Sequence, residues 1–216
     1  WLAGLGARVV IVGRTMGDCA SARAEVAAAA GDEDQVDVVA ADLSVQSEVR
    51  RLADELRARY DRIDVLLNNA GVVTPERRVT EDGLEMQFAV NYLSNFLLTH
   101  LLLDRIEGSE PGRVIMVSSD SHRQGRIDFD DLQSERGYMP LKAYTQSKLA
   151  QILFTFELAR RTEGRGVVAN ALHTGGVATD LLFTAVPAMR RLRRELKTPE
   201  QGAETPVYLA SSAQIR

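Results

Sequence analysis

The chain has 216 residues, a formal net charge of −4 and one cysteine, Cys19. This length suits a single domain with a substantial core. One cysteine excludes an internal disulfide and a cysteine-based zinc cluster, and the acidic balance argues against a nucleic-acid surface. No apolar run approaches the roughly 20 residues that cross a bilayer. We therefore expect a cytoplasmic protein. We expect no membrane span in these residues, no nucleic-acid partner and no metal site.

Short aliphatic segments alternate along the chain with longer helical patterns. The segments 8–13, 36–41, 63–67, 113–117 and 167–172 do not alternate strictly between apolar and polar side chains. Such a pattern is typical of strands that are covered on both faces. With the intervening helices it predicts right-handed βαβ crossovers and an α/β fold with a doubly wound parallel sheet of the Rossmann type.

Three segments between these strands have the spacing of helices. In 45–60, apolar residues recur every three or four positions, and Ser44 is the expected N-cap. A long helix is predicted over 84–105. Another is predicted over 143–161, with four side chains facing the core: Leu149, Ile152, Leu153 and Phe156. We expect one domain over residues 1–216.

Every predicted strand is followed by residues that suit ligand binding. In doubly wound sheets, ligands bind beyond the carboxyl ends of the strands, and a purely structural sheet needs no polar group there. The groups after the five strands are Gly13-Arg14, Asp42, Asn68-Asn69-Ala70-Gly71, Ser118-Ser119 and His173-Thr174-Gly175-Gly176. We therefore predict a binding site along this edge of the sheet.

Tyr144 and Lys148 are four residues apart in a helical pattern, so both project from one face of the helix. A nearby ammonium lowers the pKa of a phenol from its ordinary value of about 10, which brings proton transfer within reach of neutral pH. The pattern Tyr-x-x-x-Lys also occurs on solvated helix faces. Here the pair follows a loop containing Gly137 and Pro140, and a strand ending in two serines precedes that loop, which favours a catalytic pair.

With these residues in place, the sequence resembles the short-chain dehydrogenase/reductase family. Four motifs occur in the family's order: Asn68-Asn69-Ala70-Gly71, Ser119 at a strand end, Tyr144-Thr-Gln-Ser-Lys148 and Gly175-Gly176-Val177-Ala178-Thr179. The resemblance extends over essentially the whole chain, and the ordered set is far more specific than any one motif.

The resemblance implies a role for each catalytic position. Tyr144 would donate or accept the proton of the substrate oxygen, and Lys148 would lower the pKa of that tyrosine and bind the nicotinamide ribose. Asn91 would anchor a proton-relay water, the alternative being an ordinary helix amide. A serine would polarise the substrate oxygen, and Ser118 and Ser119 compete for this role. In an extended chain they point in opposite directions, and we favour Ser119.

The separation between Ser119 and Tyr144 narrows the resemblance to one branch. Segment 125–135 lengthens this connection and resembles the insertion of the retinol-dehydrogenase-like branch, in which the second serine is the catalytic one.

The cofactor prediction rests on charge at the end of the first predicted strand. A carboxylate at this family position would bind a free ribose 2′-hydroxyl and repel a 2′-phosphate, whereas this strand ends in Gly13-Arg14. A guanidinium suits a 2′-phosphate, so we favour NADP(H) over NAD(H). The resemblance places further cofactor contacts, besides Tyr144 and Lys148, at Asp42, Leu43, Asn69, Ala70, Gly71, Gly175, Val177 and Thr179.

The resemblance also predicts elements outside these residues. The family's glycine-rich phosphate loop and the strand before it are expected ahead of Trp1, and a last strand is expected after the helix that includes 206–210. Residues 1–216 would then be an NADP(H)-binding domain that lacks its first strand and binds the cofactor weakly on its own.

One function is favoured over two alternatives. It is hydride transfer between NADP(H) and a hydrophobic alcohol, aldehyde or ketone, with Tyr144 as general acid and base, in a chain compatible with a homo-oligomer. The first alternative is a catalytically silent nucleotide-binding regulatory or scaffold protein, against which the presence of all four reacting residues counts. The second, an isomerase or dehydratase on the same fold, would form product without net change of the cofactor.

Overall fold

The computed structural model describes residues 1–215. Its five strands are β1 (Val9–Gly13), β2 (Val36–Ala40), β3 (Val65–Asn68), β4 (Gly112–Val117) and β5 (Val167–Leu172). All pairs are parallel. The α/β fold with parallel sheets and flanking helices is confirmed, and the predicted strand bounds differ from the observed ones by two residues or fewer.

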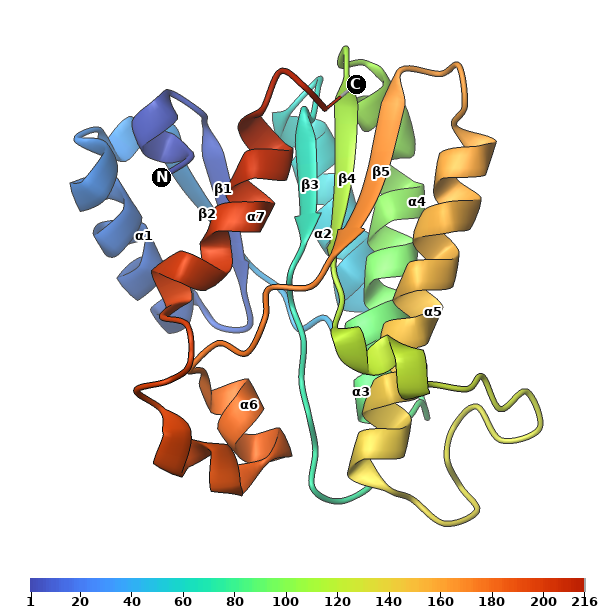
Figure 1. The fold of residues 1–216 in the computed structure, drawn as a ribbon. Coiled ribbons are helices and arrows are strands. Elements are labelled where there is room, and N and C mark those ends of the chain that lie inside the picture. The colour runs from blue at the N-terminus through green and yellow to red at the C-terminus, as the bar shows by residue number, and fades with distance from the viewer. Residues whose placement is uncertain (216) are drawn as a thin grey trace.

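Helices connect the strands and cover both faces of the sheet (Figure 1). Val114 on β4 belongs to the larger core cluster, with α2 and α4. Its neighbours Ile115 and Val117 pack on the other side with Ala210 of α7. Because successive side chains of a strand point to opposite faces, β4 is buried on both. The helices are α1 (Met16–Ala30), α2 (Gln46–Arg59), α3 (Met86–Phe88), α4 (Ser94–Glu107), α5 (Pro140–Arg161), α6 (Asp180–Ala185) and α7 (Pro199–Ser211).

The strands form two hydrogen-bonded groups, β1-β2 and β3-β4-β5. Figure 1 shows β1 and β3 on either side of α7, and among the described residues they do not pair. The strand that the family resemblance predicts ahead of Trp1 would lie at this place in the sheet. Its presence there stays a prediction.

The predicted N-cap of α2 is wrong. Val45 occupies the N-cap position and makes no side-chain cap. The Asp82 carboxylate, from a distant loop, accepts from the Gln46 N–H at 2.7 Å, while Asp42 Oδ1 accepts from the Ser44 N–H at 2.9 Å. A cap supplied from 36 residues away leaves no local sequence signal.

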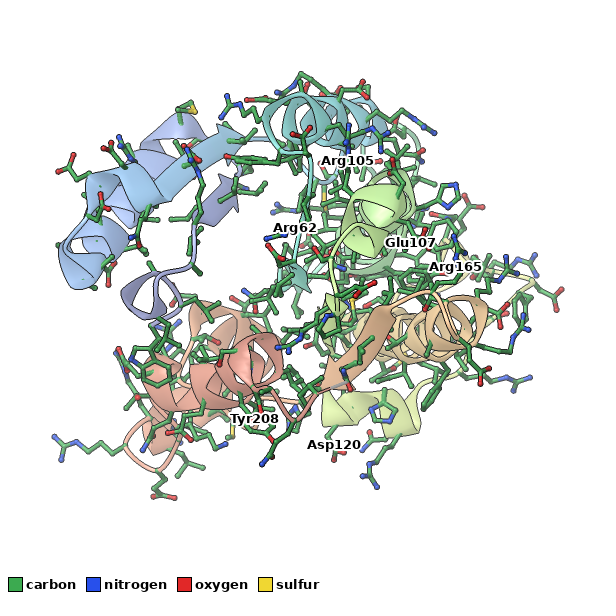
Figure 2. All side chains as sticks on the ribbon, turned by 90° about the horizontal axis from the view of Figure 1, so that it is seen from above. Arg62, Arg105, Glu107, Asp120, Arg165 and Tyr208 are labelled. Atoms are coloured by element: carbon green, nitrogen blue, oxygen red, sulfur yellow. The ribbon has the colours of Figure 1, made fainter. Side chains whose placement is uncertain are left out.

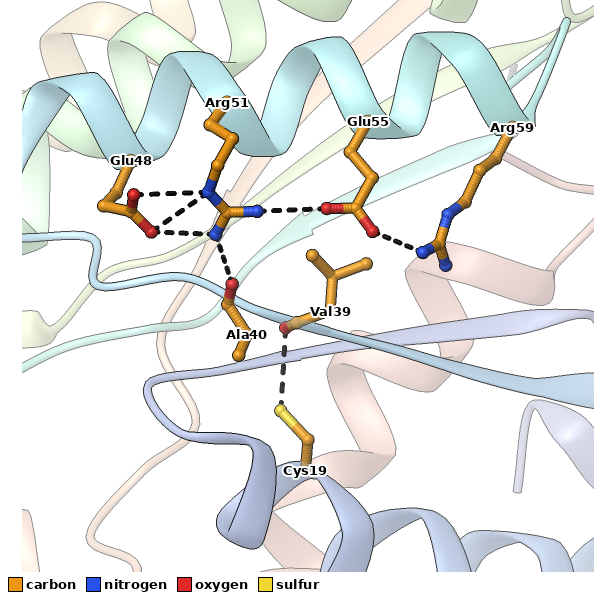
Figure 3. Close-up of polar contacts among 7 residues, drawn as sticks. All are labelled: Cys19, Val39, Ala40, Glu48, Arg51, Glu55 and Arg59. Carbon is orange, nitrogen blue, oxygen red and sulfur yellow. Dashed lines mark hydrogen bonds and ion pairs between the residues drawn. The ribbon is translucent and has the colours of Figure 1, made fainter.

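Ion pairs run along α2, and a hydrogen bond from Arg51 joins this helix to the end of β2 (Figure 3). Arg51 binds Glu48 at 2.8 Å and Glu55 at 3.0 Å, and Glu55 also pairs with Arg59. Arg51 Nη2 donates to the Ala40 carbonyl at 2.5 Å. This contact holds the helix beside the strand end that leads to Asp42.

Two further helix predictions need correction. Leu153 and Phe156 were expected to face the core, but they are 50% and 70% exposed. The buried face of α5 is largely polar instead. The amides of Gln146 and Gln151 donate to backbone carbonyls of neighbouring segments, and the serine and threonine hydroxyls of α5 donate to carbonyls of the helix itself. The helix predicted over 84–105 begins at Met86, passes through a π-helical turn at Ala89–Leu93 and continues as α4. π-helical turns are frequent at functional sites.

A buried arginine joins β4 to the end of α7. Arg113 is 8% exposed, and its guanidinium donates to the carbonyls of Leu209 at 3.1 Å, Ala210 at 2.6 Å and Ser212 at 2.8 Å. Replacing Arg113 with Met leaves these carbonyls without a hydrogen-bond donor. We therefore expect the free energy of unfolding to fall by about 2–3 kcal/mol.

Denaturant unfolding of Arg113→Met measures this change. The matched control is Arg62→Met, because Arg62 is exposed (Figure 2) and its ion pair with Asp64 is open to solvent. We expect that control to change stability by less than about 0.5 kcal/mol. Equal losses in the two variants would contradict the structural importance of the Arg113 contacts.

Candidate active site

The two serines after β4 face different surroundings. The Ser118 hydroxyl is buried and donates to the Lys148 carbonyl of α5 at 3.0 Å. Ser119 is half-buried, its Oγ accepts from the Ser121 N–H at 3.2 Å, and its hydroxyl is close enough to Tyr144 to lower the pKa of that phenol. The chain thus directs Ser119 toward the tyrosine and Ser118 into the core, as their opposite orientations predict.

Substituting each serine separates a catalytic role from a structural one. We expect Ser119→Ala to lower kcat by about 10²-fold, because a hydrogen-bond donor to the developing negative charge is lost. Ser118→Ala is expected to lower stability by about 1 kcal/mol and to leave kcat within a few-fold. Steady-state rates and denaturant unfolding of both variants check this, and an equal loss of kcat would contradict the assignment.

Tyr144 and Lys148 lie together on the second and third turns of α5. Lys148 is 3% exposed; its Nζ donates to the Val117 carbonyl at 3.0 Å and lies 5.5 Å from the centre of the Tyr144 ring. Burial lowers the pKa of Lys148 to about 8. The ammonium is therefore desolvated, stays mostly protonated at neutral pH and loses its proton as the pH rises through about 8.

The pKa of Tyr144 shifts in the direction opposite to the predicted one. The sequence predicts that the lysine lowers it, whereas in the structure burial raises the pKa of Tyr144 and the Ser119 hydroxyl lowers it in part. Desolvation disfavours the phenolate, so the neutral phenol predominates at neutral pH. Such a group is set to donate a proton to a substrate oxygen.

Asn91 lies in the π-helical turn and is fully buried. Its side chain accepts from the Val72 N–H at 2.7 Å, and donates to the Val72 carbonyl at 3.1 Å and to Ser147 Oγ at 3.0 Å. Asn91 thereby holds the segment after β3 against α5. A Cβ on Gly71 would lie 3.6 Å from Asn91 Oδ1 and 3.8 Å from Lys148 Nζ, so these three residues meet at one point.

The residues predicted for the adenosine half of a cofactor lie at the ends of β1, β2 and β3. Gly13 pairs with Ala40, which places the exposed Arg14 and the half-buried Asp42 at the same edge. Asp42 Oδ1 already accepts from a backbone N–H, and Leu43 packs against the core. Asn69 is exposed and Ala70 is half-buried.

The segment after β5 carries the residues predicted for the nicotinamide end. Gly175 has φ +87°, a conformation that favours glycine. Val177 forms a parallel bridge with Lys197, and Thr179 is the N-cap of α6, accepting from the Leu182 N–H at 3.4 Å. The sequence did not single out Lys197 for this region, although its Nζ donates to the Thr174 carbonyl at 3.2 Å.

This edge of the sheet fits a dinucleotide at both ends. The missing side chain of Gly71 leaves space beside Lys148 Nζ, whose ammonium can donate to a ribose hydroxyl. At the other end the exposed Arg14 guanidinium suits a phosphate.

Within residues 1–215, no helix combines the length and apolar character that crossing a bilayer requires. Those residues also hold no cluster of three or more His, Cys, Asp or Glu side chains suited to a metal.

Comparison with known proteins agrees with these motifs. The family model described as short chain dehydrogenase matches residues 1–189. Mouse retinol dehydrogenase 14 is 45% identical over 192 residues, which are 86% of this chain and 58% of the mouse protein. Human retinol dehydrogenase 13 is 39% identical over 224 residues, 99% of this chain and 67% of the human protein. The chain thus spans little more than half the length of the retinol dehydrogenase 14 proteins it matches.

Solved structures share the fold. An uncharacterized protein from Mycobacterium Paratuberculosis is 38% identical with a TM-score of 0.77, covering 98% of this chain and 69% of the other. The RhlG/NADP active-site complex of Pseudomonas aeruginosa is 25% identical with a TM-score of 0.77, covering 99% and 83%. The chain therefore belongs to the short-chain dehydrogenase/reductase family, within its retinol-dehydrogenase-like branch.

Proposed function

We propose that the protein transfers a hydride between NADP(H) and a hydrophobic alcohol, aldehyde or ketone. The observation that carries this proposal is the buried Lys148 ammonium beside Tyr144, with the Ser119 hydroxyl near enough to affect the pKa of that phenol. Its family supports oxidoreductase chemistry, and the retinol dehydrogenase names of its relatives support a hydrophobic substrate. The proposal concerns the whole protein, including both its activity and its substrate.

In the reductive direction the chain's own residues polarise and protonate the substrate oxygen. The Ser119 hydroxyl donates to the carbonyl and orients it, and Tyr144 gives its proton to that oxygen as negative charge develops. Lys148 stabilises the phenolate that remains, because a cation in a desolvated site acts strongly on a nearby charge. Bound NADP(H) would supply or accept the hydride, with Lys148 and Gly71 at its ribose.

The preference for NADP(H) over NAD(H) rests on Arg14. Because a guanidinium binds a 2′-phosphate through charge-assisted hydrogen bonds, we expect Arg14→Ala to weaken NADP(H) binding by about 10–100-fold. NAD(H) binding should change by less than about twofold, since NAD(H) has no 2′-phosphate. Fluorescence titration of both cofactors measures this, and equal losses for the two would contradict the proposed contact.

The substrate class is proposed from the segment that follows Thr179. Leu181 and Leu182 are half-buried and Phe183 is buried, and a Cβ on Gly71 would lie 3.6 Å from Leu181 Cδ1. Leu181 therefore reaches the point where Gly71, Asn91 and Lys148 meet. An apolar side chain there favours an apolar substrate.

Oxidation of NADPH in the presence of a panel of aliphatic and aromatic aldehydes and ketones tests the function. Full-length protein is expected to oxidise NADPH with a hydrophobic aldehyde. A regulatory or scaffold protein would bind cofactor without turnover, and an isomerase or dehydratase would form product without net change of cofactor. Either result would contradict the proposal.

A further inference from the structure

A buried glutamine lies behind Lys148, and the proposed chemistry does not use it. Gln151 is fully buried and follows Lys148 by three residues on α5, which places both on one face. Its Nε2 donates to the Asn91 carbonyl at 2.6 Å. Its Oε1 is buried without a hydrogen-bond partner among the described residues. A buried unpaired amide oxygen is destabilising and calls for an explanation.

The backbone carbonyl of Asn91, the residue expected to anchor a relay water, already has two donors. Besides Gln151 Nε2, Asn95 Nδ2 donates to it at 2.7 Å. A carbonyl oxygen has two lone pairs, so these two amides saturate it. In this arrangement a relay water needs another acceptor, and Gln151 Oε1 is a free acceptor on the same helix as the lysine.

The Lys148 ammonium has N–H groups available to donate to such a water. An ammonium carries three N–H groups, and its hydrogen bond within the described residues goes to the Val117 carbonyl. Tyr144 is the titratable group in contact with it. The other neighbouring elements present uncharged groups: β4 a carbonyl, the segment after β3 Gly71, and the π-helical turn the Asn91 amide. A buried water commonly satisfies about three such partners.

We propose that Gln151 is a positioning residue for Lys148, an inference that rests on the proposed function of Tyr144 and Lys148. Nε2 of Gln151 fixes the Asn91 carbonyl, and its Oε1 accepts from a buried water through which the lysine exchanges its proton with solvent. After Tyr144 has given its proton to the substrate oxygen, the phenolate recovers one by way of Lys148, and the lysine recovers one from solvent through this water. The Asn91 carbonyl then anchors α5.

The test compares two buried glutamines in full-length protein. Gln87 is the matched control: it is also fully buried, its Nε2 is also used, at 2.6 Å on Tyr138 and 3.0 Å on Pro140, and its Oε1 is also unpaired. The readout is the pKa of Lys148 in cofactor-free protein, from NMR titration of ¹³C-labelled lysine, with the signal assigned by its loss in Lys148→Met.

Gln151→Leu is expected to lower the pKa of Lys148 by about one unit, because an acceptor network that supports the ammonium is lost. Gln87→Leu should lower stability to a similar extent and leave that pKa unchanged. In steady-state assays, Gln151→Leu should lower kcat by about 10-fold with KM for NADPH within twofold. The alkaline limb of its kcat profile should move down by the same unit.

An unchanged pKa of Lys148 in Gln151→Leu would overturn the inference, whether or not the protein turns over substrate. If Gln151→Leu does not fold, Gln151→Glu replaces it: a carboxylate beside the ammonium raises the pKa, and an unchanged pKa there would also overturn the inference. Gln151→Asn keeps the amide and should restore part of kcat. If Gln151→Leu shifts the pKa of Lys148 but the wild-type protein does not reduce carbonyls, the proposed function is contradicted and the positioning role of Gln151 stands.

Discussion

Tyr144→Phe is expected to lower kcat for carbonyl reduction by about 10³-fold, within the range that general acid catalysis contributes. The substitution removes one oxygen atom and retains the ring against which Lys148 Nζ lies. NADPH should therefore bind with a Kd raised by less than about 10-fold, the loss of one hydrogen bond to the cofactor, and the free energy of unfolding should change by less than about 1 kcal/mol. Stopped-flow single turnover measures the loss, and fluorescence titration measures the binding.

Tyr138→Phe is the matched control for this substitution. Tyr138 lies six residues earlier, and its hydroxyl donates to the Thr74 carbonyl at 2.9 Å, away from Ser119 and Lys148. We expect it to retain kcat within a few-fold. Equal kcat in Tyr144→Phe and wild type would exclude Tyr144 as the proton donor.

Lys148→Met is expected to lower kcat by about 10²–10³-fold without lowering stability. The buried ammonium is costly to fold, because its pKa drops from 10.5 to about 8. This difference corresponds to about 3 kcal/mol. Met removes that cost but leaves the Val117 carbonyl unpaired, which costs about 1–3 kcal/mol, so the two contributions nearly cancel at neutral pH.

The pH dependence of stability follows from the same pKa. Between pH 8 and 10.5 the unfolded lysine binds more protons than the folded one, so wild-type stability rises with pH across this window and the penalty is complete below it. Lys148→Met should lack this rise in denaturant unfolding. In wild type, carbonyl reduction should fall as pH rises through about 8, because the charge that stabilises the phenolate is lost.

The sequence predicts the strands well because each reads as a short aliphatic run, but of the described strands only β4 is buried along its whole length. β1 is half-buried throughout, and β3 carries the exposed Leu67. Local geometry also predicts that Ser118 and Ser119 point in opposite directions, because neighbouring residues of an extended chain do so. The choice of Ser119 rests on the resemblance to the retinol-dehydrogenase-like branch. The meeting of Tyr144 and Lys148 on one helix face depends on local geometry alone.

The errors arise where distant residues decide. Asp82, not Ser44, receives the first N–H of α2, and Leu153 and Phe156 are exposed because the core side of α5 binds backbone groups through polar side chains. The raised pKa of Tyr144 depends on burial, which the pair spacing does not report. Gln151 carries no sequence signal beyond its position one turn after Lys148.

Isotope transfer tests the central claim most directly. Full-length protein, NADPH deuterated at the transferable position of the nicotinamide C4 and a hydrophobic aldehyde are incubated, and the product is examined by mass spectrometry. We predict an alcohol that carries deuterium at the former carbonyl carbon in wild type, with formation about 10³-fold slower in Tyr144→Phe. Cofactor binding without a deuterated alcohol, or equal rates for the two proteins, would contradict hydride transfer with Tyr144 as the acid.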